Sequence, residues 1–171
     1  MDLNTFINSS LGQNKLTPKQ VVANPIMFLA FGFGSGLAKF APGTFGTLIT
    51  VPIYLLLIQT HYLIYSITTV ACCLFGINIC GIAAKRLGEH DFSGIVWDEV
   101  AGFLVTMLFV PFSWTAVIYG FILFRLFDIV KPWPIKWIDA QVEGGFGIML
   151  DDIIAGLFAG GVLFGLQNYI L

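Results

Sequence analysis

The chain has 171 residues, of which 57% are hydrophobic and 11% charged, and its mean hydropathy is +0.89. Soluble domains carry about 25% charged residues, so this composition excludes an ordinary water-facing surface and predicts a membrane protein. The formal net charge of −2 argues against nucleic acid as a partner. We expect residues 1–23 to form a polar cytosolic tail without a cleavable signal pattern, and residues 24–171 to form a single all-α membrane domain.

Apolar segments follow one another along the chain and predict a polytopic helical bundle with about five spans. A full crossing needs about 20 apolar residues. Residues 25–37 are too few and run into glycines, so we expect a half-helix or a re-entrant piece there. The predicted spans are residues 47–59, 62–84, 96–110, 114–130 and 150–171. The third and fourth spans are expected to form a hairpin around a proline-containing turn.

Lysine and arginine fall on one side of the predicted bundle. They precede the first apolar segment, lie in the loop after it, or stand at the ends of the second and fourth spans. The turns at 59–61 and 111–113 contain neither residue type. By the positive-inside rule, the N-terminus is therefore cytosolic and both neutral turns face outward.

Histidine and cysteine contribute little to the predicted chemistry. His61 falls in an outer turn and is expected to be interfacial, whereas His90 lies in a cytosolic loop, either solvated or assisting proton transfer. Cys72, Cys73 and Cys80 share one apolar run and are expected to be packing residues. Cys80 formally opens the C-x5-R pattern of cysteine phosphatases, but a helix interior offers no free N–H groups to stabilise a thiolate.

Carboxylates from three predicted helices meet at the cytosolic side. Asp98 and Glu99 open the third span, Asp128 closes the fourth, and Asp151 and Asp152 open the fifth. Carboxylates near hydrocarbon are costly unless they are paired, coordinated or hydrated. Because hard oxygen ligands suit Mg²⁺, Mn²⁺ or Ca²⁺, we predict that all five bind one or two divalent cations and that all except Asp151 are catalytic. The structural alternatives are helix caps for the last two, and an ion pair of Asp128 with a nearby basic residue.

Two glycine-rich stretches accompany the acidic residues. Residues 32–36 lead into 42–47 just before a helix, where backbone N–H groups can bind phosphate. We expect this whole stretch to fold over the cytosolic end. Residues 144–147 form a second such loop, although glycine also serves close helix packing. The predicted phosphate-binding side chains are Ser35, Lys39, Thr44, Arg125 and Lys131.

Four motif-bearing segments cover nearly the whole chain outside the polar tail. They are Gly34-Ser35-Gly36 with Pro42-Gly43-Thr44, Val96-Trp97-Asp98-Glu99, Phe124-Arg125 with Asp128-Ile129-Val130-Lys131-Pro132-Trp133-Pro134-Ile135, and Gly144-Gly145 with Asp151-Asp152. In this order the segments resemble the phosphatidylglycerophosphatase A family of bacterial inner membranes. The resemblance implies a Mg²⁺-dependent, multi-pass inner-membrane phosphatase. Such an enzyme hydrolyses the phospholipid phosphatidylglycerophosphate to phosphatidylglycerol and inorganic phosphate at the cytosolic leaflet.

Other mechanisms and functions remain as alternatives. A metal-activated water competes with a covalent aspartyl-phosphate, against which the absence of a D-x-D-x-T/V signature argues. The main alternative function is a small divalent-cation or proton-coupled transporter, which needs carboxylates spread through the membrane depth rather than gathered at one end. An inert scaffold gives no reason for glycine loops beside acidic pairs. A lipid phosphotransferase would carry D-G-x2-A-R…D-x3-D, which is absent.

Overall fold

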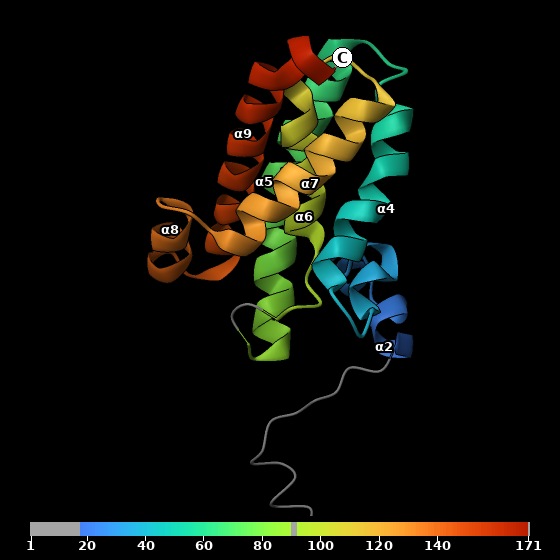
Figure 1. Cartoon of the computed structure of the whole chain (residues 1–171). Helices are drawn as coiled ribbons and strands as arrows, with labels where there is room; N and C mark the ends of the chain where they lie inside the picture. Colours follow the sequence, from blue (N-terminus) through green and yellow to red (C-terminus); the bar gives the residue numbers. More distant parts are fainter. Residues whose placement is uncertain (1–17, 90–91, 171) are drawn as a thin grey trace, which may run out of the picture.

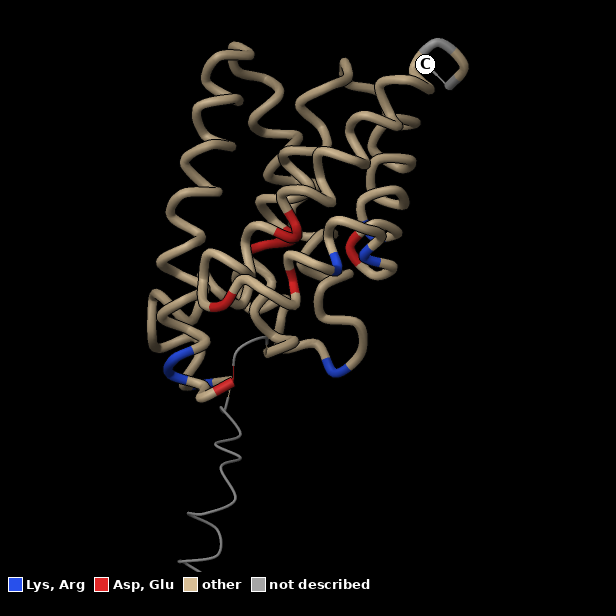
Figure 2. Tube along the Cα trace, turned by 90° about the vertical axis from the view of Figure 1, so that its left-hand side faces the viewer, with Lys and Arg blue, Asp and Glu red and all other residues tan. Residues whose placement is uncertain are grey.

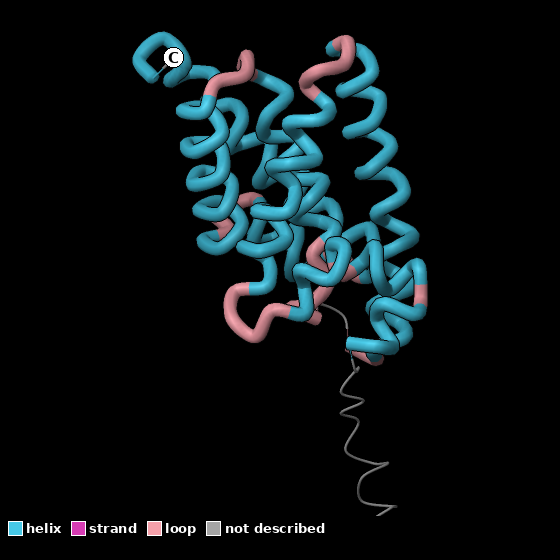
Figure 3. Tube along the Cα trace, turned by 90° about the vertical axis from the view of Figure 1, so that its right-hand side faces the viewer, coloured by secondary structure: helices cyan, strands magenta, loops and turns pink. Residues whose placement is uncertain are grey.

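Helices make up all of the regular secondary structure in residues 18–89 and 92–170, the part of the chain that the computed structural model describes. In chain order they are α2 (Pro18–Ala23), α3 (Pro25–Ala30), the 3₁₀ helix η1 (Gly32–Leu37), α4 (Pro42–Leu57), α5 (Tyr62–Leu87), α6 (Trp97–Thr106), the 3₁₀ helix η2 (Met107–Phe109), α7 (Trp114–Val130), α8 (Ile135–Gln141) and α9 (Gly144–Ile170). The five longest run side by side, with α2 at the lower end and the C-terminus at the upper end (Figure 1). Two loops close the upper end (Figure 3). The expected all-α bundle is therefore confirmed.

Helix α6 is the centre of the bundle. All ten of its residues are buried, and it packs against α4, α5, α7 and α9. Phe103 and Leu104 of α6 join Phe124 of α7 and Leu163 of α9 in one fully buried apolar cluster. Removing this apolar surface from water or from polar headgroups holds the helices together. The short α6 therefore has a fixed position from which its first turn can carry functional groups.

Small residues let α6 and α9 approach closely. A Cβ on Gly156 of α9 would collide with the backbone oxygen of Gly102 of α6. One turn further on, a Cβ on Gly160 would lie 2.9 Å from the backbone oxygen of Thr106. Gly156 and Gly160 form the G-x-x-x-G pattern that brings membrane helices into backbone contact. Because this contact lies one turn beyond the acidic residues of both helices, it sets their separation.

Four predicted helices have different limits in the structure. The predicted helix at 47–59 begins earlier, at Pro42, because proline suits the first position of a helix. The predicted helix at 96–110 ends as an α-helix at Thr106 and continues as η2 to Phe109. The last helix begins at Gly144 rather than at residue 150, so the glycine loop expected at 144–147 is its first turn. The helix predicted at 62–84 extends to Leu87 before Gly88 ends it, whereas the prediction of a helix over 114–130 is confirmed.

The N-terminal segment folds as short helical pieces, as expected for residues 25–37. Asn24 caps α3 by accepting a hydrogen bond from the backbone N–H of Met27 at 3.2 Å. The chain then reverses through Gly32 and Gly34, whose φ angles of 52° and 94° favour glycine. Helix α2 lies within the predicted polar tail, and residues 1–17 of that tail lie outside the described residues. Helix α8 is an element that the sequence did not predict.

Two helices in the described residues are long and apolar enough to cross a membrane, fewer than the five predicted spans. They are Tyr62–Leu87 and Gly144–Gln167, and α4 is a shorter apolar helix. Both helices qualify by length and composition alone, and a helix buried in a protein core can have the same length and composition. The apolar window of α9 is 56% buried inside the protein, whereas that of α5 is 28% buried. Helix α5 therefore presents the larger share of its apolar surface outward.

Candidate active site

A cavity of about 340 Å³ lies between α4, α6, α7 and α9. All five carboxylates predicted as metal ligands line it, together with Arg125 and Lys131. The remaining lining residues are Ala41, Pro42, Gly43, Ser93, Ile95 and Ile129. In Figure 2, the acidic and basic residues of the described chain lie from about mid-height down to the lower end, and the upper part is free of them. Charge is therefore confined to one side of the bundle, with some of the acidic residues at mid-height rather than at its end.

Asp98 and Glu99 are the second and third residues of α6, and both are buried. The start of this helix is held by a hydrogen bond from the backbone N–H of Val96 to the backbone oxygen of Ala30, at 2.8 Å. Trp97 Nε1–H donates to the backbone oxygen of Cys72 on α5, at 3.2 Å. The positive end of the helix dipole favours carboxylates in this first turn. Both acidic residues are thus placed by α6 and its neighbours α3 and α5.

Asp151 and Asp152 lie two turns inside α9 and are also buried. The first turn of α9 rests on α5, where a Cβ on Gly145 would collide with the backbone oxygen of Ile77. Helix α9 therefore begins at its contact with α5, two turns before the acidic pair. The acidic pair then reaches the start of α6, rather than capping its own helix as the structural alternative supposed.

Arg125 forms an ion-pair group with two of the carboxylates. Its Nη1 lies 2.5 Å from Asp128 Oδ2, one turn later on α7, and 3.5 Å from Glu99 Oε1 on α6. A Cβ on Gly43 would collide with Glu99 Oε1 and would lie 2.9 Å from both terminal nitrogens of Arg125. Glycine therefore allows the first turn of α4 to rest directly on this ion pair.

Lys131 follows α7 in a left-handed conformation, with φ of 43°. Its Nζ donates to Asp151 Oδ2 and to Asp139 Oδ1, each at 2.7 Å. Burial by itself lowers the pKa of Lys131, but the hydrogen bonds to Asp139 and Asp151 and their negative charges outweigh it. The pKa is therefore raised, and the ammonium group keeps its charge at neutral pH.

Asp98, Glu99 and Asp152 are arranged to hold a metal ion, since one oxygen from each lies within 4.8 Å of the others. Within the described residues, four buried carboxylate oxygens have no hydrogen-bond partner: Asp98 Oδ1, Glu99 Oε2, Asp151 Oδ1 and Asp152 Oδ2. Unpartnered buried oxygens are costly, and a hard divalent cation compensates them. The donor set therefore fits Mg²⁺.

The five carboxylates predicted as metal ligands differ in their ion pairs with basic side chains. Asp128 is bound to Arg125, which is the ion pair foreseen as its structural alternative, and Asp151 gives one oxygen to Lys131. The three-carboxylate group of Asp98, Glu99 and Asp152 has no such tight cation partner, because Glu99 contacts Arg125 only at 3.5 Å. These three residues are therefore the centre of the candidate metal site, with the other two carboxylates beside it.

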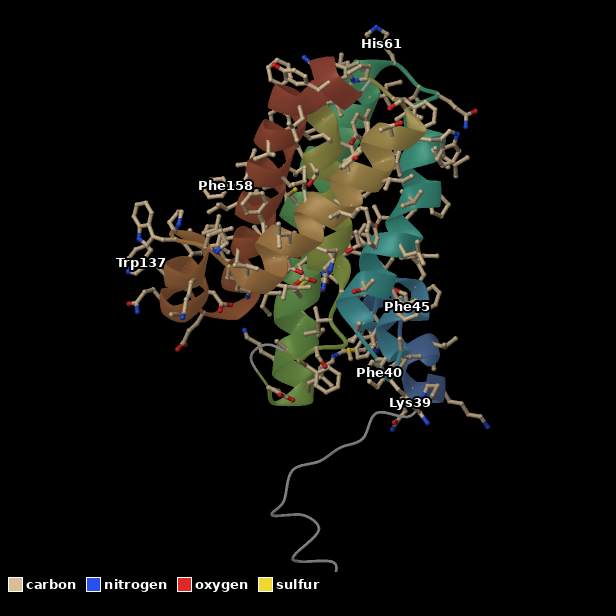
Figure 4. The ribbon with its side chains drawn as sticks, viewed as in Figure 1. Lys39, Phe40, Phe45, His61, Trp137 and Phe158 are labelled. Atoms are coloured by element: carbon tan, nitrogen blue, oxygen red, sulfur yellow. The ribbon has the colours of Figure 1, made fainter. Side chains whose placement is uncertain are left out.

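Three predicted phosphate-binding residues do not line the cavity. Ser35 Oγ donates to the backbone oxygen of Gly32 within its own turn, at 2.8 Å. Lys39 is exposed at the lower end and points away from the bundle (Figure 4). Thr44 follows the last α4 residue that lines the cavity. Of the stretch expected to fold over the cytosolic end, residues 41–43 line the cavity, and η1 before them packs on α3 and α4.

The structure places His61 and Cys80, two of the residues whose roles the sequence predicted. His61 is exposed at the upper end (Figure 4), where its Nδ1 accepts a hydrogen bond from the backbone N–H of Leu63 at 3.3 Å and caps α5. His90 lies outside the described residues. Cys80 is buried with its Sγ 3.8 Å from Met149 Sδ, so the packing role is confirmed.

Sequence reasoning did not single out Asp139, Ser93 or Ile129. Asp139 reaches the site because the chain turns at 132–134 and folds α8 back toward α9. No local periodicity signals that contact, since the lysine and the aspartate are eight residues apart. The motif from Asp128 to Ile135 ends before Asp139. Extending the motif through the following helix would have included Asp139 among the candidate residues.

The family model described as Phosphatidylglycerophosphatase A matches residues 28–167. The chain belongs to this family. A phosphatidylglycerophosphatase A of Escherichia coli K12 is 42% identical over 149 residues, which are 86% of this chain and 87% of that protein. A phosphatidylglycerophosphatase A of Haemophilus influenzae Rd is 42% identical over 161 residues, covering 93% and 99% of the two chains. The protein is therefore a phosphatase of the phosphatidylglycerophosphatase A family.

One further relative carries a different name. A protein of Bacteroides thetaiotaomicron is 37% identical over 140 residues, which are 78% of this chain and 87% of that protein. This relative is named as a phosphatidylinositol-3-phosphatase, an assignment that its name marks as provisional. No solved structure matches the chain.

Proposed function

We propose that this member of the phosphatidylglycerophosphatase A family removes the phosphate monoester of phosphatidylglycerophosphate, forming phosphatidylglycerol and inorganic phosphate in phospholipid biosynthesis. The observation that carries the proposal is a single cavity lined by five carboxylates and two basic side chains. Acidic residues suit a metal ion, and Arg125 and Lys131 suit the phosphate. The identity of the lipid rests on the two relatives with that name.

Arg125 and Lys131 are proposed to bind the phosphate and to balance its charge as the reaction proceeds. Both side chains line the cavity and are held by carboxylates, so little reorganisation is needed when substrate arrives. The first turn of α4 adds the backbone at Gly43, at the positive end of a 16-residue helix. Ser35, Lys39 and Thr44 are left out of this proposal because none of them lines the cavity.

Asp98, Glu99 and Asp152 are proposed to hold Mg²⁺, with Asp128 and Asp151 beside them. The ion would supply charge neutralisation and would lower the pKa of water. A carboxylate that is not occupied by the ion accepts the proton of the attacking water. Water oxygen then bonds to phosphorus while the bond from phosphorus to the glycerol oxygen breaks, and that oxygen leaves with the proton that the carboxylate took from water. A covalent aspartyl-phosphate is the competing route through the same residues.

The site is proposed to lie at the cytosolic side of the bacterial inner membrane. Lys85 and Arg86 lie in the last turn of α5, and this helix ends at the lower end of the bundle (Figure 1), as the positive-inside rule requires for a cytosolic lower end. Large apolar side chains are exposed along α5 and α7, which fits these two helices facing lipid rather than water. The exposed residues are Leu63, Ile67, Val70 and Leu74 on α5, and Ile118, Ile122, Leu126 and Ile129 on α7. The acyl chains can stay in the bilayer while the headgroup enters the cavity.

The test is phosphate release by purified protein in detergent micelles, first with Mg²⁺, then with excess EDTA, and then with Mg²⁺ restored. We expect release from phosphatidylglycerophosphate that EDTA abolishes and Mg²⁺ recovers. Phosphatidylinositol 3-phosphate and phosphatidic acid serve as comparison substrates. A preference for either one would replace the proposed lipid, and release that is indifferent to EDTA would remove the metal from the mechanism.

The transporter alternative predicts a different outcome. A transport path needs polar groups through the membrane depth, whereas the charged residues of the described chain lie from about mid-height down to the lower end (Figure 2). Liposomes containing the protein should therefore take up no more Mg²⁺ or protons than empty liposomes. Protein-dependent uptake together with no phosphate release would favour the transporter.

A further inference from the structure

The ammonium group of Lys131 is shared between a buried and a half-exposed carboxylate. Its Nζ lies 2.7 Å from Asp151 Oδ2 in the cavity wall and 2.7 Å from Asp139 Oδ1 on α8. The Asp151 side chain is 8% exposed and that of Asp139 is 40% exposed, so the second carboxylate lies outside the cavity. We propose that Asp139 is a positioning residue that aims Lys131 at the phosphate of the substrate.

Helix α8 holds the Asp139 carboxylate in a fixed position. Ile135 and Ile138 are buried and attach the helix to the bundle, where it packs on α9. Trp137, between them, is 60% exposed and points away from the bundle (Figure 4). Asp139 follows the second isoleucine, on the side where Lys131 ends α7. The two apolar anchors therefore fix the place of the carboxylate without taking part in the chemistry.

An ammonium group has three N–H donors. Asp139 and Asp151 accept two of them, which leaves the third for another acceptor at the cavity that Lys131 lines. With a single acceptor, a lysine can rotate about that one bond and its long side chain keeps most of its freedom. Two acceptors on different helices restrict this rotation, so the third donor is directed before substrate arrives.

This inference rests on the proposed role of Lys131 in phosphate binding, so its test measures both residues in one cycle. The variants are Asp139→Asn, Lys131→Met and the double variant, with Asp139→Glu as the conservative replacement. Glu143→Gln removes an exposed carboxylate just beyond α8 and is the matched control. Initial rates of phosphate release give kcat and KM for each variant with phosphatidylglycerophosphate at saturating Mg²⁺.

We expect Asp139→Asn to lower kcat/KM about tenfold, because the amide oxygen accepts the hydrogen bond without the negative charge that holds the ammonium group in place. Asp139→Glu should recover most of that loss, and Glu143→Gln should match wild type. In the Lys131→Met background, adding Asp139→Asn should change kcat/KM by less than about twofold, because the partner through which Asp139 acts is gone.

Two results would overturn the inference. Wild-type kinetics in Asp139→Asn would show that Lys131 needs no second negatively charged partner. Losses that add in full in the double variant would mean that Asp139 acts on α8 rather than through Lys131. If the wild type prefers another phosphate monoester, the proposed substrate fails, but the same cycle run on the preferred substrate still decides the role of Asp139.

Discussion

Replacing Gly102 by alanine should disturb the active site without touching a charged group. A Cβ at this position would lie 2.5 Å from Phe124 Cε2 and 2.8 Å from the backbone oxygen of Asp152. Since ordinary contact begins at 3.4 Å, the backbone of α9 would have to move by about 0.6 Å at Asp152. Phe124 is fully buried in the apolar core, so it cannot turn outward without displacing its neighbours. The displacement therefore falls on a candidate metal ligand.

The expected cost appears in both stability and activity. Overpacking of this kind costs about 1–3 kcal/mol of folding free energy. A displacement of about 1 Å in a catalytic group can cost about 100-fold in rate, so a shift of about 0.6 Å should lower kcat/KM by at least about tenfold. The Mg²⁺ concentration for half-maximal activity should also rise, because Asp152 moves relative to Asp98 and Glu99.

The assay is phosphate release across a Mg²⁺ titration, with thermal unfolding in the same detergent as the measure of stability. Gly161→Ala is the matched control, because a Cβ at that position of α9 meets no atom within 4 Å. It should leave both activity and Mg²⁺ dependence near wild type. If folded Gly102→Ala protein had wild-type kcat/KM and Mg²⁺ dependence, the view that this helix contact sets the geometry of the site would be refuted.

Other substitutions test individual residues of the site. Asp98→Asn and Asp152→Asn should each lower phosphate release by about 1000-fold or more while the protein still inserts, because an amide is a weak ligand for a divalent cation; wild-type turnover in either would exclude it from the metal site. Gly43→Ala should lower kcat/KM about tenfold by displacing Arg125, and an unchanged KM and kcat would contradict this. Lys39→Ala should stay within about twofold of wild type in the same assay, because Lys39 does not line the cavity.

Much of the architecture could be predicted from hydrophobicity and charge. The helix over 114–130 has the predicted limits, because a proline-containing turn precedes it and Lys131 follows in a left-handed conformation. The charge pattern indicated correctly that charge is confined to one side of the bundle. Apolar composition was a poorer guide to which helices cross the membrane. Helix α6 is apolar because other helices surround it, and composition cannot distinguish such a helix from one surrounded by lipid.

The candidate site was predictable in its residue types but not in its arrangement. Five carboxylates beside basic residues and glycines are enough to indicate metal and phosphate chemistry. Which carboxylates remain unpaired depended on the tertiary structure, because Arg125 and Lys131 neutralise Asp128 and Asp151 through contacts between side chains that the fold brings together. Phosphate-binding roles for Ser35 and Lys39 were also predicted from the sequence, but the reversal of the chain through Gly32 and Gly34 keeps both residues outside the cavity.

The amino-acid sequence alone establishes an all-α chain, the charge asymmetry of its ends and a family of phosphatases, since these follow from composition and from motifs read along one dimension. The candidate metal site of Asp98, Glu99 and Asp152, the close contact between Gly102 and Gly156 and the contact of Asp139 with Lys131 come from the tertiary structure alone. Each joins residues that no local pattern pairs, and the approach of one helix to another decides whether they meet.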